Sequence, residues 1–369
     1  MRVLHIANWY PSKQHPFKAL WVKRHIDSLP VGVENKIYHI EISKGRYSYK
    51  VSSEEINHRS YELSLPFQIW RVNEILYSVI LIYVLFIRER RSGYNIINFH
   101  IAYPLLRYYN LIRAVLKVPT IVSEHWSAYH YHFNLKGSGK LNPIKKIFSH
   151  SIPIITVSKS LGDDIKNFSG FGFKNYVLPN IVDRNIFKPL KNSQKTSSDQ
   201  YFLMVSQWKS PKLPVIAIDG FLKFVEDFPL VKLRIIGYGP QLEEMKIAAA
   251  GHPNIIFHGA LAPDLIAQYM SNAVALVHPS EYETFSVVCA EALACKCPVI
   301  ASKVGGIPEF VNSHNGILLE QHDENTVYQA MKKCMIEPPV MSDLPDFSLT
   351  TIGDQYYRIL QNEIEKIEP

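Results

Sequence analysis

The sequence is poor in cysteine, and no apolar run is long enough to cross a membrane. Its 369 residues include four cysteines, none of which belongs to a CxxC pair. They are Cys289, Cys295, Cys297 and Cys334. Three of them lie too close together for disulfides that would cross-link distant segments, so we predict reduced core thiols in a cytosolic protein. The most hydrophobic segment, 75–87, is shorter than the roughly 20 residues of a transmembrane helix and predicts a buried helix.

Other patterns are also missing. The chain has no internal repeat, no heptad run and no ligand set of His, Cys and Asp for a metal. The first residues, MRVLHIANWYP, reach Trp, Tyr and Pro before an apolar signal sequence accumulates, so we expect no cleaved signal peptide. A net charge of +7 and a pI near 9.0 favour phosphate-bearing partners. Nucleic acid is not expected among them, because the chain lacks a basic helix and an interleaved aromatic and basic stripe.

Apolar runs alternate with helical patterns along the chain. At roughly 100 to 200 residues per domain, the length predicts two domains. Strand-like runs in the first half lie at residues 1–8, 96–99, 120–123 and 152–157. After a polar linker, 191–200, five more lie at residues 202–205, 233–236, 255–257, 273–277 and 299–301. The alternation predicts two doubly wound α/β domains with parallel sheets, followed by an amphipathic last helix, 349–364.

The densest group of polar functional residues lies in the segment that begins HPSEYETF. Glu283 follows a strand-like run, and Glu291 lies inside a predicted helix that begins near Phe285 and Ser286. The amides of Phe285, Ser286 and Val287 are then free donors at a helix N-terminus, which suits a phosphate. Glu291 offers two oxygens to vicinal hydroxyls. Each carboxylate also has a structural interpretation: Glu283 as a favourable charge at the helix N-terminus, and Glu291 as a solvent-facing helix residue.

The segment and its surroundings closely resemble the retaining glycosyltransferases of the GT-B fold, family 4 (glycosyl transferases group 1). Five motifs fall in that family's order and spacing: PN-x-VD at 179–183, GxGP at 237–240, Glu-x7-Glu at 283–291, PVIA at 298–301 and GGIPE at 305–309. The resemblance covers nearly the whole chain. It implies two Rossmann-like domains facing a central cleft. Residues 1–190 would bind the acceptor and 191–345 the nucleotide sugar, and we expect the C-terminal helix, about 346–369, to pack back on the first domain.

The resemblance also implies roles for single residues of the second domain. Glu283 would contact the sugar, Glu291 the ribose hydroxyls, and Gly237 and Gly239 would belong to the donor loop. A leaving nucleoside diphosphate needs cationic or amide stabilisation, and Lys212 stands where the family has a lysine.

Two positions depart from the family's pattern. Gln207 stands where an arginine is expected, and glutamine offers neither the charge nor the fork geometry of a guanidinium. Lys209 is either a substitute for that charge or a solvated loop lysine. Lys296 replaces the glycine that usually follows the Glu-containing helix, which affects the shape of the loop.

In the first half, the resemblance points to His125, which follows a strand and would face the donor sugar. His100 is a second histidine at a strand end, with structural and functional readings about equally supported. Glu124 would either orient the acceptor or cap the next helix. Ala19 occupies a glycine position of the first loop, where alanine disfavours a positive φ. A nearby basic cluster would attract an anionic membrane or a diphosphate-linked lipid, or is a solvated face. It comprises Lys13, Lys18, Lys23 and Arg24.

The resemblance implies transfer of a hexose-type sugar from a nucleotide diphosphate to a hydroxyl acceptor with retention of configuration. The departing phosphate oxygen would accept the acceptor's proton on the same face. No cofactor or metal is expected, since the chain has no DxD motif in a suitable loop and basic side chains and helix amides would supply the electrostatics. Expected partners are a nucleotide sugar, a sugar or lipid-linked glycan acceptor in cell-surface polysaccharide assembly, and the inner face of the membrane. An epimerase-like or phosphorylase-like enzyme and a catalytically silent nucleotide-sugar-binding protein are the alternatives.

Overall fold

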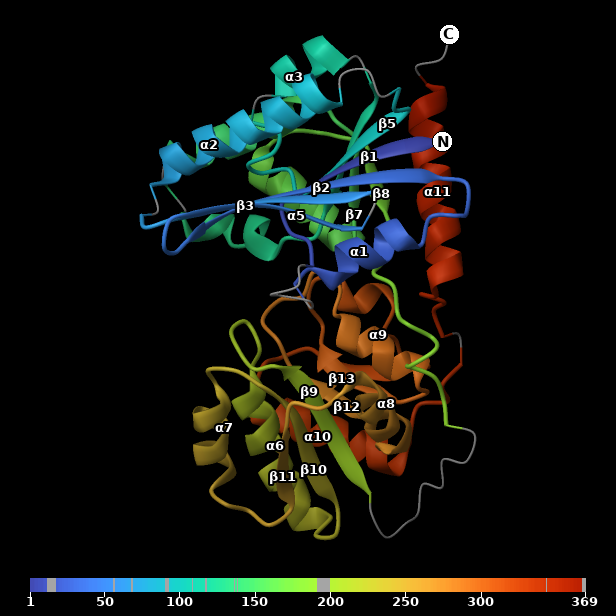
Figure 1. Ribbon diagram of the computed structural model, residues 1–369. Helices are drawn as coiled ribbons and strands as arrows, with labels where there is room; N and C mark the ends of the chain where they lie inside the picture. The colour runs from blue at the N-terminus through green and yellow to red at the C-terminus, as the bar shows by residue number, and fades with distance from the viewer. Residues whose placement is uncertain are drawn as a thin grey trace. The chain divides into compact units, whose positions relative to one another are not determined.

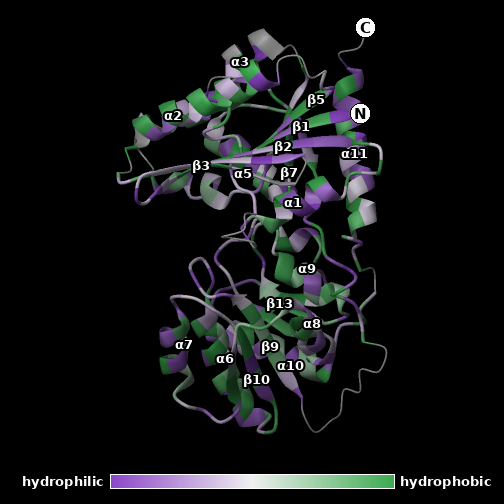
Figure 2. Ribbon diagram, in the orientation of Figure 1, coloured by the Kyte–Doolittle hydropathy of each residue, from purple (hydrophilic) through white to green (hydrophobic). Residues whose placement is uncertain are grey.

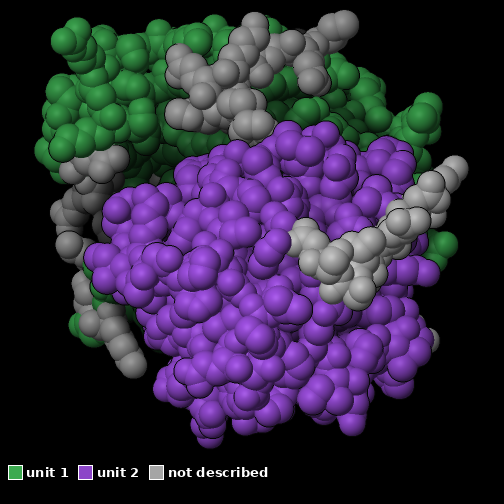
Figure 3. Space-filling view, turned by 90° about the horizontal axis from the view of Figure 1, so that it is seen from below, with its two compact units in different colours: residues 1–180, 349–369 green, residues 181–348 purple. Residues whose placement is uncertain are grey.

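Parallel β-strands form two separate sheets in the computed structural model (Figure 1). The structure describes residues 1–11, 18–55, 57–67, 69–89, 93–107, 109–116, 118–135, 137, 139–190, 200–342 and 344–366. Of the predicted linker, 191–200, only Gln200 belongs to these residues, and Lys13 of the basic cluster also lies outside them. The chain divides into two units, Met1–Asn180 with Leu349–Pro369, and Ile181–Ser348, which Figure 3 distinguishes by colour.

The first unit contains an eight-stranded sheet, in the order β3-β4-β2-β1-β5-β6-β7-β8, within the described residues. All neighbouring strands are parallel except the β3–β4 pair. The strands are β1 (Arg2–Ala7), β2 (Glu34–Lys44), β3 (Ser48–Glu55), β4 (His58–Leu65), β5 (Ile96–His100), β6 (Thr120–Glu124), β7 (Ile154–Thr156) and β8 (Asn175–Val177). Its helices are α1 (Leu20–Asp27), α2 (Trp70–Ile82), which continues as the π-helix η1 (Tyr83–Arg88), α3 (Tyr109–Leu116), α4 (Asn142–Ile147), α5 (Lys159–Ser169) and α11 (Leu349–Glu365). Short 3-10 turns are η2 (Ser127–Tyr129), η3 (His132–Asn134), η4 (Gly139–Leu141) and η5 (Phe148–His150).

The second unit contains a six-stranded, wholly parallel sheet in the order β11-β10-β9-β12-β13-β14. The strands are β9 (Tyr201–Gln207), β10 (Lys232–Tyr238), β11 (Ile255–Gly259), β12 (Leu276–His278), β13 (Val299–Ser302) and β14 (Gly316–Leu319). The helices are α6 (Pro214–Asp227), α7 (Leu242–Ala249), α8 (Pro263–Asn272), α9 (Val287–Ala294) and α10 (Glu324–Ile336), with a 3-10 turn, η6 (Ile307–Glu309). The predicted class, two doubly wound α/β domains, is therefore confirmed.

Local sequence signals explain several helix boundaries. Ser158 accepts a hydrogen bond from the amide of Leu161 at the start of α5, and Gly170 ends that helix in the left-handed region. Asp323 caps α10 in the same way by accepting from Thr326 N at 2.8 Å. In the second sheet, β9, β12 and β13 are short apolar runs whose side chains are buried on both faces, as expected of parallel strands covered by helices.

The boundary between the units lies after Asn180, not after residue 190 as expected. Residues 181–190 belong to the second unit because they bond to it: Val182 N donates to Phe347 O at 2.9 Å, and Ser271 Oγ donates to Lys188 O at 3.3 Å. The last helix, α11, belongs to the first unit, where it contacts α1 and β5 (Figure 1).

The segment 75–87 is helical, but the expectation that it is buried holds for only one of its faces. Tyr77, Leu81, Val84 and Leu85 are buried. Four apolar side chains spaced by four residues are instead 40–72% exposed, and Figure 2 shows apolar bands along α2. They are Ile75, Val79, Tyr83 and Ile87. Among the described residues, no helix is both long and apolar enough to cross a membrane.

Candidate functional site

One carboxylate in the second unit holds two basic side chains. Glu283 lies in the loop after β12, and its Oε1 accepts hydrogen bonds from Lys212 Nζ and from His278 Nε2, the latter at 2.6 Å. Burial alone would raise the pKa of Glu283, but Lys212 and His278 outweigh it and lower that pKa to about 2. Burial lowers the pKa of His278. Glu283 is therefore ionised at neutral pH and keeps a second oxygen for a ligand.

Backbone contacts fix Lys212 beside Glu283. The loop after β9 runs along the loop after β12, where Leu213 N donates to Pro279 O and Glu281 N donates to Pro211 O. On the other side of Glu283, its carbonyl accepts from Gly306 N at 3.0 Å. A Cβ on Gly305 would lie 1.7 Å from the same carbonyl, so only glycine fits there. The position of Glu283 is thus set by three separate loops.

The helix that follows starts two residues later than expected. Helix α9 begins at Val287, because Ser286 is left-handed with a φ of 71° and Phe285 is extended into the core against Phe310 and Phe347. The amides that lack a helical acceptor are those of Ser286, Val287 and the two residues that follow, because the first helical bond runs from Ala290 N to Ser286 O. Phe285 lies before the helix and is not one of these donors. Glu291 lies on the second turn of α9 and is partly exposed.

The two predicted donor-loop glycines allow a close approach of two backbones. A Cβ on Gly237 would lie 1.9 Å from Ser206 O, and one on Gly239 would lie 2.1 Å from Trp208 O. Any larger residue would push the loop after β10 away from the loop after β9. Gln207, the last residue of β9, is exposed, and so is Lys209.

In the first unit, buried histidines gather at the carboxyl ends of neighbouring strands and on α1. His5 Nδ1 lies 3.1 Å from His100 Nε2, and the rings of His25 and His125 are 5.4 Å apart. Burial lowers the pKa of all four, to about 4 for His5 and His25. Both ring nitrogens of His125 are buried without a hydrogen-bond partner, a rare condition that a bound ligand would relieve. The structure thus brings the two predicted histidines, His100 and His125, into one cluster.

Glu124 and Ala19 take structural positions in this unit. Glu124 Oε1 accepts from Ala102 N and from Tyr129 Oη, both at 2.6 Å, and the side chain is fully buried. Burial raises the pKa of Glu124 to about 7, against the opposing effect of these hydrogen bonds. Ala19 precedes α1 in the left-handed region, with a φ of 50°. Lys18, from the expected basic cluster, pairs with Glu41 at 2.5 Å.

The first unit also contains an aromatic cavity of about 730 Å³ that was not predicted from the sequence. Trp9 and Trp126 meet edge to face at 5.1 Å, and Phe133 packs against Trp126 at 4.9 Å. Lys18, Glu41 and Glu74 place charges on its wall. Its residues come from five segments that are far apart in the sequence, so only Trp9 and Trp126, each just after a strand, carried a detectable signal. His278 was missed because a single histidine at a strand end predicts nothing about its partner.

No group of three His, Cys, Asp or Glu side chains suited to a metal occurs among the described residues. The four cysteines are buried and form no disulfide, as expected. The roles of the predicted site residues stay predictions, since geometry alone does not assign a ligand to them.

Residues 200–337 match the family described as Glycosyl transferases group 1. An uncharacterized glycosyltransferase of Methanocaldococcus jannaschii, MJ1178, is 28% identical over 238 residues, 63% of each chain. Sulfoquinovosyl transferase SQD2 of Arabidopsis thaliana is 28% identical over 214 residues, 54% of this chain and 41% of the relative. Both alignments span less than two thirds of the relative.

The fold extends over the whole chain. The structure of Anabaena Alr3699/HepE, described in complex with UDP and glucose, has a TM-score of 0.72 and 17% identity and covers 98% of this chain and 100% of its own. The catalytic domain of starch synthase IV from Arabidopsis thaliana has a TM-score of 0.69 and 15% identity and covers 99% of each chain. Residues 200–337 are therefore similar to the glycosyl transferases group 1, and the chain has the GT-B fold.

Proposed function

We propose that this chain is a retaining glycosyltransferase that moves a sugar from a nucleoside diphosphate to a hydroxyl acceptor. The observation that carries the proposal is the Lys212–Glu283–His278 network, which stands beside the start of α9 inside the family match. A cation, helix N-terminal amides and an ionised carboxylate together suit a diphosphate linked to a sugar.

The second unit would bind the donor. Lys212 and the first amides of α9 would hold the diphosphate, and Glu291 the ribose hydroxyls. The free oxygen of Glu283 would accept from a sugar hydroxyl. Since Lys212 already pairs with Glu283, a bound diphosphate would compete for the same ammonium group. The fixed helix amides and Lys212 would then stabilise the charge that develops on the leaving diphosphate, without a metal or another cofactor.

The first unit would bind the acceptor. Its aromatic cavity offers the faces of Trp9 and Trp126 together with the carboxylate of Glu41, a combination that suits the apolar face and the hydroxyls of a sugar. His125, with both nitrogens unpartnered, would hold a hydroxyl of the transferred sugar. Retention would follow if the departing phosphate oxygen takes the acceptor's proton on the same face of the sugar.

The exposed apolar stripe on α2 and η1 supports attachment to an anionic membrane surface. Tyr49 and Val51, on the edge strand β3, add further exposed apolar area. Arg88 follows the stripe, and Arg46 stands in the turn before β3, both exposed. Apolar side chains flanked by cations suit an interface that bears negative lipids. Lipid-linked glycan assembly at the cytoplasmic face is the setting we propose, and cysteines that form no disulfide fit a reducing compartment.

A panel of UDP-, GDP- and ADP-sugars tests the donor proposal, with thermal shift for binding and nucleoside diphosphate release for turnover. We expect one donor to bind and to be hydrolysed slowly without an acceptor. Glu291→Ala should weaken binding of that donor at least tenfold and leave the melting temperature of the free protein unchanged. Glu226→Ala, a change at an exposed glutamate on α6 of the same unit, is the control. Unchanged binding and turnover in Glu291→Ala would overturn the assignment.

The exposed Gln207 keeps a catalytically silent binding protein and an epimerase-like enzyme as alternatives. Binding of the donor without release of nucleoside diphosphate supports the silent protein. Conversion of the donor sugar into its epimer, again without release of nucleoside diphosphate, supports the epimerase. Gln207→Arg tests the geometry: it should preserve or raise turnover if the diphosphate lies beside the end of β9. A large loss of turnover would place the diphosphate elsewhere.

Membrane attachment is tested by flotation with vesicles of phosphatidylcholine alone and with phosphatidylglycerol added. The chain should float with the anionic vesicles, and the double variant Val79→Ser/Ile87→Ser should float several-fold less. Leu230→Ser, at an exposed apolar residue of the second unit, is the control. Equal flotation of the stripe variant and the control would exclude this surface.

A further inference from the structure

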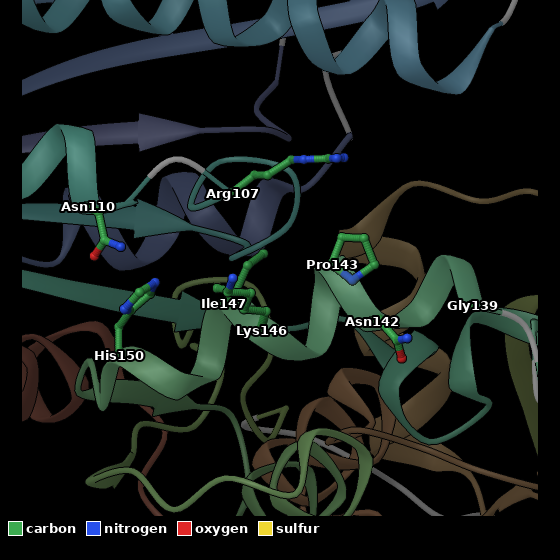
Figure 4. A pocket seen from close by; sticks show the side chains of 8 residues that line it. All are labelled: Arg107, Asn110, Gly139, Asn142, Pro143, Lys146, Ile147 and His150. Atoms are coloured by element: carbon green, nitrogen blue, oxygen red, sulfur yellow. The ribbon is translucent and has the colours of Figure 1, made fainter.

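Two cavities in the first unit meet at His150. The larger, about 630 Å³, lies between α3 and the segment from η4 to η5, and Figure 4 shows Asn110 and His150 pointing toward one another from its two walls. Lys146 and Asn142, both from α4, also line it. The smaller cavity, about 460 Å³, shares His150 and adds Arg113 from α3. Neither shares a lining residue with the aromatic cavity.

The basic groups around these cavities are not matched by carboxylates. None of the described residues that line the larger cavity is an Asp or a Glu. In the smaller cavity, Glu363 already accepts from Lys174, Tyr176 and Lys366. Arg107, at the rim of the larger cavity, is paired with Glu74. Lys146 therefore stands near His150 with no carboxylate among the described lining residues of the larger cavity. In the smaller cavity, the hydrogen bonds of Glu363 go to residues other than Arg113.

Lys146 and Arg113 lie close enough to His150 to act on the charge of its imidazole. Burial lowers the pKa of His150, and Lys146 and Arg113 lower it further. The chain thus keeps two cations and an imidazole together at an electrostatic cost. An anion placed between them would remove that cost, because it attracts both cations and favours the protonated imidazole.

We propose that this cavity, named here the His150 cavity, binds the phosphate group of a small ligand or a lipid headgroup. A phosphate monoester carries a charge of about −1.5 to −2 at neutral pH and has three acceptor oxygens, which match Lys146, Arg113 and His150. The amides of Asn110 and Asn142 add neutral donors. Pro143 and Ile147 give the larger cavity an apolar wall, and its volume lies in the range of small-molecule sites. This site is additional to the proposed donor and acceptor sites.

The test uses the full-length protein and the imidazole proton resonances of His150, identified by their loss in His150→Gln. Inorganic phosphate should raise the pKa measured for His150. Lys146→Gln should weaken this effect of phosphate at least tenfold, measured as the concentration at half-effect. Lys145→Gln is the matched control, because Lys145 lies on the same helix but stands over the ring of Phe168, 5.5 Å from its centre. Because the resonances belong to His150, they report phosphate bound in this cavity and not phosphate bound near Lys212.

A second arm distinguishes a soluble ligand from a lipid. Short-chain phosphatidic acid, whose headgroup is a phosphate monoester, and phosphatidylcholine are titrated against the same resonances. A response to phosphatidic acid as well as to inorganic phosphate identifies a headgroup site, and a response to inorganic phosphate without one to phosphatidic acid identifies a soluble ligand. The proposal is overturned if neither probe shifts His150, or if Lys145→Gln and Lys146→Gln reduce the response equally. Both results are independent of glycosyl transfer, so they leave the proposed function untouched.

Discussion

At the scale of single residues, the second unit depends on compensated charge. Glu283 is mostly buried, with its side chain 12% exposed, and Lys212 is 18% exposed. A carboxylate in this position is tolerated because two donors meet it. Removing Lys212 or Glu283 leaves the other charge buried without its counter-charge. The resulting loss of stability is larger than the net stability that the intact pair contributes.

A double-mutant cycle on this pair should therefore show strong coupling. We expect Lys212→Met to lower the free energy of unfolding by about 3 kcal/mol, because Glu283 then keeps only His278 as a partner. Adding Glu283→Gln should restore at least about 1 kcal/mol of that loss. Urea unfolding followed by circular dichroism measures all four proteins. Additive effects of the two substitutions would show that the pair is not coupled.

Buried histidines and one buried glutamate make opposite contributions to stability as the pH falls. His5, His25 and His39 have pKa values near 4 in the folded chain against an ordinary 6.5, because burial disfavours the charged ring. Below pH 6.5 the unfolded chain binds protons that the folded chain does not, so stability falls. Glu124 has a pKa of about 7 against 4.5, so stability rises as the pH falls between these values.

The histidines should dominate, since at least three of them act against one carboxyl. We expect the free energy of unfolding to fall from pH 6.5 to pH 4.5 in the native chain. In Glu124→Gln this fall should be steeper by up to about 1.4 kcal/mol per pH unit, because the compensating gain is lost. Glu226→Gln, at an exposed carboxyl, is the control. Parallel pH profiles for Glu124→Gln and the native chain would contradict the prediction.

At the scale of secondary-structure elements, two helix ends adopt a backbone that favours glycine. Ala19 precedes α1 with a φ of 50°, and Lys296 follows α9 with a φ of 57°. The sequence analysis marked both as departures from glycine. At both positions the backbone is left-handed although the residue carries a side chain. This conformation lowers the free energy of unfolding by roughly 1–2 kcal/mol per residue.

Replacing these two residues by glycine should stabilise the protein. We expect Lys296→Gly to raise the free energy of unfolding by roughly 0.5–1 kcal/mol, after allowance for the greater freedom of glycine in the unfolded chain. Ala19→Gly should gain less, because the buried methyl group of Ala19 is lost. The control is Ala217→Gly in the interior of α6, which should lower the free energy of unfolding by about 1 kcal/mol. A loss of stability in Lys296→Gly would mean that its side chain makes contacts that outweigh the strain.

Three of the strands that the sequence did not predict lack a continuous apolar run. Strands β2 to β4 were missed because polar and apolar residues alternate along them, as in ENKIYHIEISK, and one face of this end of the sheet is partly exposed. Strands β9 and β13 were predicted because burial on both faces favours an apolar run. The start of α9 was misplaced because the left-handed conformation of Ser286 leaves no mark in the sequence.

At the scale of the whole molecule, the last helix completes the first unit. Ile352, Tyr356, Ile359 and Leu360 of α11 are buried there, and Tyr356 Oη bonds to Asn98 Nδ2 in β5. A Cβ on Gly353 would lie 2.0 Å from Ser28 O, so α11 rests closely on the end of α1. The two ends of the chain therefore depend on each other for burial.

A chain that ends at Ser348 should destabilise the first unit selectively. Each large side chain lost from the core contributes about 1.5–3 kcal/mol of burial. Hydrogen exchange should therefore accelerate in β1, β5 and α1 and stay unchanged in β9 and β10. A chain that ends at Glu365 keeps all of α11 and is the control. Equal acceleration in both units would show that they do not unfold separately.

The sequence by itself determined the class of fold, the position of several apolar strands and the Glu-x7-Glu motif, because these are set by local periodicity and spacing. Tertiary structure decided which groups meet. It joined Lys212, His278 and Glu283, which are held by loops after different strands, and it turned Glu124 inward. It also gathered the aromatic cavity and the His150 cavity from distant segments. Parallel strands bring their loops together only when the sheet forms, so no stretch of sequence records these contacts.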